Sequence, residues 1–91
     1  MASDRQLAVA LRYLEGKDEA PRVVARGWGA VASEILRLAR EHGVPVHPDS
    51  DLAEVLSRIE VGKYIPEELY QAVAEVLAFL YRTNQRARSR S

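Results

Sequence analysis

The sequence predicts a small α/β domain in which about three helices surround a small mixed β-sheet, with about three strands from this chain. Three observations support this fold class. Short β-branched runs are bounded by proline and glycine, as in strands. Apolar residues recur at helical spacing between Trp28 and Glu41. A second, longer helical pattern begins at Pro66 and runs to Arg82.

The first part of the chain carries a predicted hairpin. Residues 7–11 form a short apolar run whose periodicity alone fits a strand or a helix. Residues 23–25 follow Pro21, contain two valines and stop at Gly27, which is typical of a strand. The turn-rich residues 15–19 lie between these two runs, and the link is short enough to join antiparallel strands.

The first predicted helix covers Trp28 to Glu41 and has one apolar side. We expect the indole of Trp28 to pack in the core rather than to mark an interface. Gly43 is placed to end this helix in a left-handed conformation. Val44-Pro45-Val46 predicts a third, short strand, and its proline favours an edge or an end of the sheet.

Two further helices are predicted in the second part of the chain. Asp51 and Glu54 have the spacing of a capping box at the start of a short helix. The last helix begins at Pro66, which suits the first helical position. Its apolar residues, with Leu77 on the widest face, cover most of its circumference. Such a helix is either the main core helix or is also covered by a partner.

Composition indicates one folded domain over residues 1–82 and a disordered Arg-rich tail over residues 83–91. The 91 residues, of which 47% are hydrophobic, suffice for one modest core. The chain has no cysteine, which excludes disulfides and thiolate sites and is compatible with a reducing cytosol. No apolar run is long enough to span a membrane, and no signal-peptide pattern is present.

The formal net charge is zero, but the charges are unevenly distributed. All 13 acidic residues precede the last four of the 13 basic residues, which are Arg82, Arg86, Arg88 and Arg90. An alternative function follows from this tail, namely a regulatory domain that binds nucleic acid or anionic membrane through its arginines. The tail has no interleaved aromatic residue, so binding would be weak and salt-sensitive, and we expect no nucleic-acid partner.

No catalytic, metal or cofactor site is predicted. His42 and His47 are the only histidines, and two histidines without a third fixed ligand rarely form a closed metal site. No serine has a neighbourhood that would activate it as a nucleophile, and no glycine-rich phosphate loop occurs. We therefore expect a protein that is not an enzyme and has no cofactor.

The most specific signal comes from four segments that occur in order across residues 7–82: Leu7 to Tyr13, Ala20 to Gly27, Glu41 to Val46 and Arg58 to Arg82. Together they resemble the cytoplasmic C-terminal domain of the FlhB/YscU/EscU family of flagellar and type III secretion export switch proteins. The resemblance favours a strand for residues 7–11. It also implies that the chain acts in protein export without catalysis.

The family's self-cleavage motif is replaced in this chain. Family members carry Asn-Pro-Thr-His immediately before the stretch that matches Leu7 to Leu11, and they cut themselves between Asn and Pro. The four matching positions are Ser3, Asp4, Arg5 and Gln6. Ser3 has no amide to attack its own carbonyl carbon, and Asp4 has no ring to hold a strained turn. We expect a free-standing counterpart of the released fragment that does not cleave itself.

The resemblance implies a substrate-specificity switch module that binds export substrates or apparatus components, including the N-terminal part of a full-length switch protein. Its expected location is the cytoplasm, at the inner face of the membrane export gate, without membrane insertion. In relatives a further strand comes from the residues before the cut, so the sheet edge beside residues 7–13 is expected to lack a partner. The expected partner-binding residues lie nearest to the missing cleavage turn: Val9, Leu11, Tyr13, Glu15 and Lys17.

Overall fold

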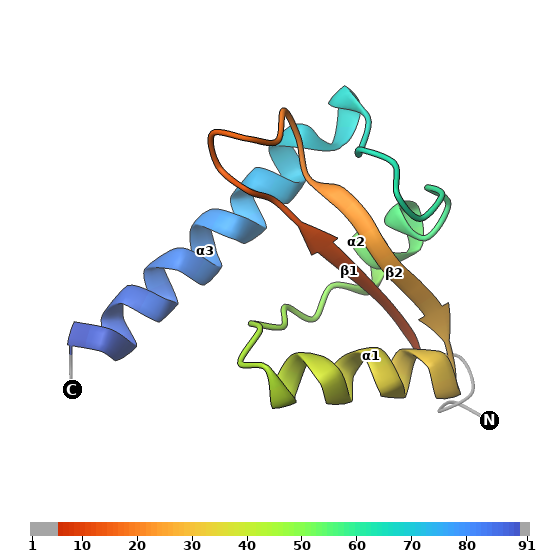
Figure 1. Cartoon of the computed structure of the whole chain (residues 1–91), viewed down its shortest axis with the longest axis horizontal. Coiled ribbons are helices and arrows are strands. Elements are labelled where there is room, and N and C mark those ends of the chain that lie inside the picture. Colours follow the sequence, from red (N-terminus) through yellow and green to blue (C-terminus); the bar gives the residue numbers. More distant parts are fainter. Residues whose placement is uncertain (1–5, 90–91) are drawn as a thin grey trace.

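The computed structural model describes the backbone of residues 6–89 and the side chains of residues 6–83 (Figure 1). The elements are β1 (Leu7–Arg12), β2 (Arg22–Trp28), α1 (Ala30–Glu41), α2 (Ser50–Leu56), a 3-10 turn η2 (Glu67–Leu69) and α3 (Tyr70–Ser89). The predicted α/β fold class is confirmed, with three α-helices around a small sheet.

Strands β1 and β2 form the antiparallel hairpin that the sequence predicted. The register runs from Leu7 opposite Trp28 to Arg12 opposite Arg22. A bulge interrupts the pairing, because consecutive residues of β1 face Ala25 and Val23, which leaves Val24 unpaired and 42% exposed.

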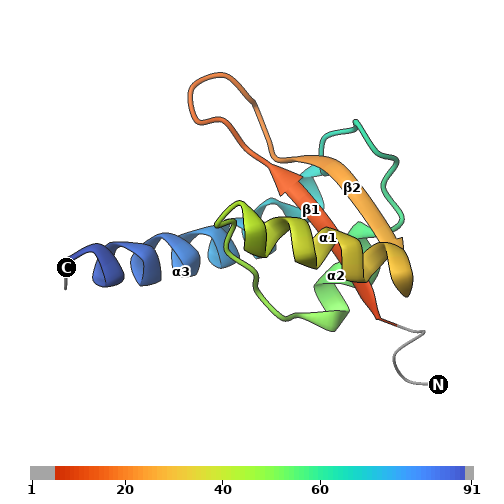
Figure 2. The same cartoon turned by 60° about the horizontal axis from the view of Figure 1, so that its bottom comes forward.

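Helices cover both faces of the hairpin (Figures 1 and 2). Side chains alternate between the two faces of a strand, so Ala8 and Val9 point in opposite directions. On the face of Ala8, α1 packs so closely that a Cβ at Gly27 would lie 2.1 Å from Cγ1 of Val31. On the face of Val9 and Leu11, α2 and α3 complete the main core. Its fully enclosed members are Ala20, Val23, Leu56, Ile65 and Val73.

One edge of the sheet is partly covered. The Val23 N–H donates to the Lys63 carbonyl at 3.0 Å, and the Gly62 N–H donates to the Val23 carbonyl at 2.7 Å. The Ile65 N–H donates to the Pro21 carbonyl at 2.9 Å. The chain after α2 thus occupies the start of the outer edge of β2.

The predicted third strand is wrong. Val44–Val46 is extended but is not part of a sheet, so the sheet has two antiparallel strands in the described part of the chain instead of three mixed ones. The Val44 N–H donates to the carbonyl of Ala39 at 2.8 Å, at the end of α1. An extended segment becomes a strand only when a neighbour accepts and donates its main-chain hydrogen bonds. Val44–Val46 has no such neighbour among residues 6–89.

Two local predictions also need correction. Trp28 ends β2 instead of starting α1, and its side chain is 49% exposed instead of packed in the core. Helix α2 is capped by Asp49 instead of Asp51, because Asp49 is extended and its Oδ1 accepts from the Leu52 N–H at 3.1 Å. The prediction for Gly43 is confirmed, since its φ of 68° lies in the left-handed region.

The last helix differs from its prediction at both ends. Pro66 precedes the 3-10 turn η2, and the α-helix itself begins at Tyr70. The backbone stays helical from Thr83 to Ser89, inside the stretch that was predicted to be disordered. Four of these seven residues are glutamine, arginine or alanine, which favour helices. The second half of α3 projects away from the hairpin in both views (Figures 1 and 2).

Candidate functional site

The outer edge of β1 is free. The Gly29 N–H donates to the Gln6 carbonyl at 2.8 Å, which makes this a hydrogen-bonded pair of the ladder. Such pairs alternate with non-bonded pairs along an antiparallel ladder. Leu7, Val9 and Leu11 therefore direct their N–H and C=O groups away from β2. Within residues 6–89 these groups have no hydrogen-bond partner.

A groove of about 880 Å³ runs beside this free edge, and we call it the edge groove. Its lining is mainly apolar and comes from β1, α1, the segment after α1, α2 and α3. Tyr81 of α3, which is 54% exposed, and Val44 and Val46, each about half-exposed, belong to it. Further lining residues are Trp28, Ile35, Ala39, Leu77 and Leu80.

The structure brings together three of the five residues predicted to bind a partner. Val9, Leu11 and Tyr13 line the edge groove. Glu15 and Lys17 do not line it and are exposed in the loop between β1 and β2. Sequence reasoning missed the contribution of α3, although the wide apolar circumference of that helix was the signal for a covering partner. The binding role of all five residues remains a prediction.

The positions that replace the cleavage motif are only partly described. Ser3, Asp4 and Arg5 lie outside the described residues. Gln6 is exposed, and its carbonyl joins the ladder through Gly29. The absence of self-cleavage therefore remains a prediction from the sequence.

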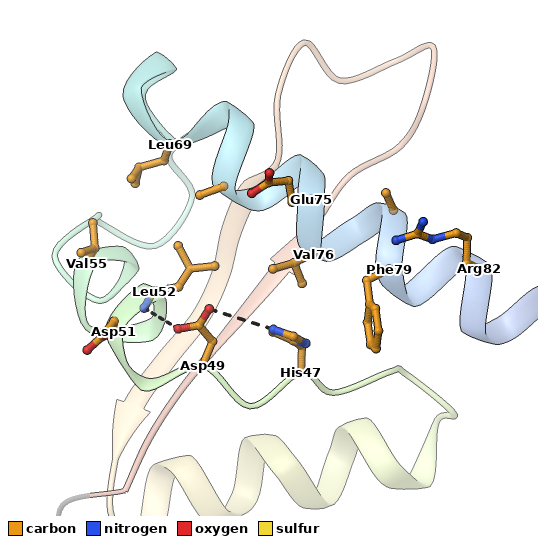
Figure 3. A pocket seen from close by; sticks show the side chains of 12 residues that line it. His47, Asp49, Asp51, Leu52, Val55, Leu69, Glu75, Val76, Phe79 and Arg82 are labelled. Atoms are coloured by element: carbon orange, nitrogen blue, oxygen red, sulfur yellow. Dashed lines mark hydrogen bonds and ion pairs between the residues drawn. The ribbon is translucent and has the colours of Figure 1, made fainter.

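A second groove, of about 970 Å³, lies between α2 and α3, and we call it the helix groove (Figure 3). His47 lies at one side of this groove, between Asp49 and Phe79 (Figure 3). The His47 Nε2 lies 4.0 Å from Oδ2 of Asp49, and the imidazole meets the ring of Phe79 edge-on at 5.8 Å. In the part of the chain that the structure describes, no three His, Asp or Glu side chains gather as metal ligands would.

Charged side chains outside the grooves form a small exposed network on α1. Arg37 donates to both carboxylate oxygens of Glu34, at 3.1 and 2.6 Å, and also contacts Glu41. The hydrogen bond from Arg37 lowers the pKa of Glu34 below its usual value. None of the helices in residues 6–89 has the length and hydropathy needed to span a bilayer.

Comparison with known proteins gives the family. The model described as the FlhB HrpN YscU SpaS family matches residues 4–80. The YlqH protein of Bacillus subtilis is 43% identical over 83 residues, which are 91% of this chain and 89% of YlqH. The flagellar biosynthetic protein FlhB of Yersinia enterocolitica is 53% identical over 75 residues. That match covers 81% of this chain but only 20% of FlhB, so the chain spans about a fifth of that relative.

Solved structures agree with this assignment. The cytoplasmic domain of FlhB from Shewanella putrefaciens matches with a TM-score of 0.88 at 34% identity, covering 93% of this chain and 67% of that one. The PscU C-terminal domain matches with a TM-score of 0.77 at 40% identity, covering 81% of this chain and 95% of that one. The chain therefore belongs to the FlhB HrpN YscU SpaS family and has the fold of its C-terminal cytoplasmic domain.

Proposed function

We propose that this chain is a non-catalytic interaction module of the flagellar or type III protein export apparatus. Membership of the export family supports the role in protein export. The observation that carries the rest is the free main-chain edge of β1 inside an apolar groove. An unpaired edge with neighbouring apolar pockets is the geometry that accepts an added strand.

The proposed partner is an extended segment from an export substrate or from an apparatus component, such as the N-terminal part of a full-length switch protein. Its main chain would bond to the outward N–H and C=O groups of Leu7, Val9 and Leu11. Each such bond contributes about 0.5–1.5 kcal/mol net.

The side chains of the partner segment face two different walls. On the α1 side the wall includes the small residues Ala8, Ala10 and Ala39. On the α3 side it includes Leu80 and Tyr81. Because side chains alternate along a strand, one set of the partner's side chains meets each wall. A segment with apolar residues in both sets fits best, which resembles a strand buried on both faces.

We place this activity in the cytoplasm, beside the membrane export gate. The matched domain of Shewanella FlhB is a cytoplasmic domain, and the matched family comprises export proteins, which supports this location. In this role the chain acts in the substrate-specificity switch by occupying, or competing for, the position of the corresponding domain in a full-length switch protein.

The proposal is tested with a labelled peptide that ends in the Asn of the cleavage motif, taken from a switch protein of the same organism. Val9→Pro removes one outward N–H without removing a bond to β2, so the hairpin should survive while binding weakens at least tenfold. Tyr81→Ala removes part of the α3 wall and should weaken binding without touching the strand. Unchanged affinity in both variants would overturn strand addition in the edge groove.

A further inference from the structure

We propose that the helix groove is a second docking surface, centred on another side of α3 from the edge groove, and that it takes a basic amphipathic helix. The two surfaces lie on different sides of α3. Phe79 lines only the helix groove, whereas Tyr81 lines only the edge groove. His47, Asp49, Leu52 and Val76 line both grooves, so the residues of α3 other than Val76 distinguish the two surfaces.

The shape of the helix groove fits a helix of about three turns. Its α3 wall is formed by residues that recur every three or four positions from Ala72 to Arg82, which is one side of a helix. The ten steps from Ala72 to Arg82, at about 1.5 Å each, give a wall about 15 Å long. Leu52 and Val55 of α2 form the facing wall (Figure 3).

The floor of the helix groove is apolar and uncovered. Phe79 is 50% exposed and Val55 is 40% exposed, and Leu69 and Val76 are further apolar residues of the lining. The imidazole of His47 meets the ring of Phe79 edge-on and borders the floor beside it. Exposed apolar side chains rimmed by polar ones mark an interaction surface.

The rim of the helix groove is acidic, which sets the charge of the partner. Asp51 and Glu75 are exposed carboxylates that form no ion pair with another side chain of residues 6–83. Asp49 adds a third carboxylate, although its Oδ1 accepts a hydrogen bond from the Leu52 N–H and its Oδ2 faces His47. Among the described side chains that line the groove, Arg82 is the one arginine or lysine, and it stands at one end. Lysine or arginine on the partner would meet these carboxylates.

A helix is a better occupant than a strand in this groove. The main-chain groups of α2 and α3 are used within the helices themselves, so the walls offer no free edge to an extended segment. Recognition must then come from contacts between side chains of the groove and side chains of the partner. Apolar anchors at i, i+3, i+4 and i+7 supply such contacts in helix-in-groove complexes.

The test uses a synthetic helical peptide with leucines at i, i+3, i+4 and i+7 and lysines on both flanks. The control peptide carries glutamates in place of the lysines. The isotope-labelled full chain is titrated with each, and amide shifts are recorded. We expect the lysine peptide to shift signals of α2 and of residues 72–79, and to bind at least tenfold more tightly than the glutamate peptide.

Two matched variants separate the helix groove from the edge groove. Phe79→Ala and Tyr81→Ala each truncate a half-exposed aromatic residue of α3, so both variants should remain folded. Phe79→Ala should weaken the lysine peptide at least tenfold, as loss of an aromatic anchor does, and leave the strand peptide unaffected. Tyr81→Ala should weaken binding of the strand peptide and leave binding of the lysine peptide unaffected. Equal effects of the two variants on the lysine peptide would overturn the proposal.

Charge removal provides an independent test. Glu75→Gln and Asp51→Asn keep the shape of the rim, and each should weaken the lysine peptide several-fold at low salt and less at high salt. If the affinity for the lysine peptide stops depending on salt only when Glu75→Gln and Asp51→Asn are combined, the acidic rim is supported as the recognition element. Equal binding of the two peptides, or self-association of the chain through these same signals without peptide, would overturn the basic-helix assignment.

Discussion

Val73→Ala should lower the free energy of unfolding more than Leu77→Ala does, although valine is the smaller side chain. Both residues line the edge groove, but Val73 is only 2% exposed, whereas Leu77 is only partly buried. Val73→Ala removes two methyl groups, at about 0.8 kcal/mol each, and leaves an enclosed cavity, for a total loss of about 2–3 kcal/mol. Leu77→Ala removes more atoms but leaves no enclosed cavity, so it should cost about 1–2 kcal/mol.

Urea denaturation of both variants measures this difference, with Pro66→Ala as a control. Pro66 is exposed and lies just before η2, so its replacement should change the free energy of unfolding by less than about 0.5 kcal/mol. The sequence alone had placed Leu77 on the widest apolar face and predicted a loss of about 2–5 kcal/mol if it were fully buried. A larger loss for Leu77→Ala than for Val73→Ala would show that the edge groove is closed in solution.

Three further predictions concern the N-terminal segment and the α1 side of the domain. The intact mass should stay that of a single species at neutral pH over days, and cleavage between Ser3 and Asp4 would refute the loss of self-cleavage. Gly27→Ala should cost about 1–3 kcal/mol in urea denaturation, because its new Cβ meets α1 at 2.1 Å, and wild-type stability would contradict that contact. Arg37→Ala should raise the pKa of Glu34 in an NMR pH titration. The stability that this pair contributes is present at neutral pH and is lost as the pH falls through the lowered pKa of Glu34. The Arg37→Ala variant should therefore lose less stability than the wild type between neutral and acidic pH.

Much of the fold follows from local sequence signals. The hairpin was predictable because valines bounded by Pro21 and Gly27 favour a strand. The end of α1 was predictable because Gly43 alone takes the left-handed conformation there without strain. These signals act over a few residues, so no tertiary contact is needed to read them.

The errors arose where tertiary contacts decide the outcome. Val44–Val46 has the composition of a strand, but pairing needs a neighbour that residues 6–89 do not supply. Trp28 lies in β2 because the strand continues past Gly27, where the missing side chain admits α1. Asp49 and Asp51 are both plausible caps in sequence, and only the path of the chain before α2 selects Asp49.

The two grooves were the least predictable features. The free edge of β1 was expected from the resemblance to the export family, and Val9, Leu11 and Tyr13 were assigned to it. The walls that turn this edge into a groove come from α3 and from the segment after α1, which are distant in sequence. The sequence indicated only that the last helix is apolar over most of its circumference; the helix groove itself was not predictable, because its apolar floor and acidic rim come from two helices that only the fold brings together.

Hydrogen exchange at the free edge of β1 tests the central claim most directly. The amides of Leu7, Val9 and Leu11 point away from β2, so they should exchange rapidly in the isolated chain, while Ala8 and Ala10 should be protected. Addition of the peptide that ends in the cleavage-motif Asn should protect the three outward amides. Unchanged exchange at Leu7, Val9 and Leu11 with saturating peptide, while the peptide binds elsewhere, would contradict strand addition at this edge.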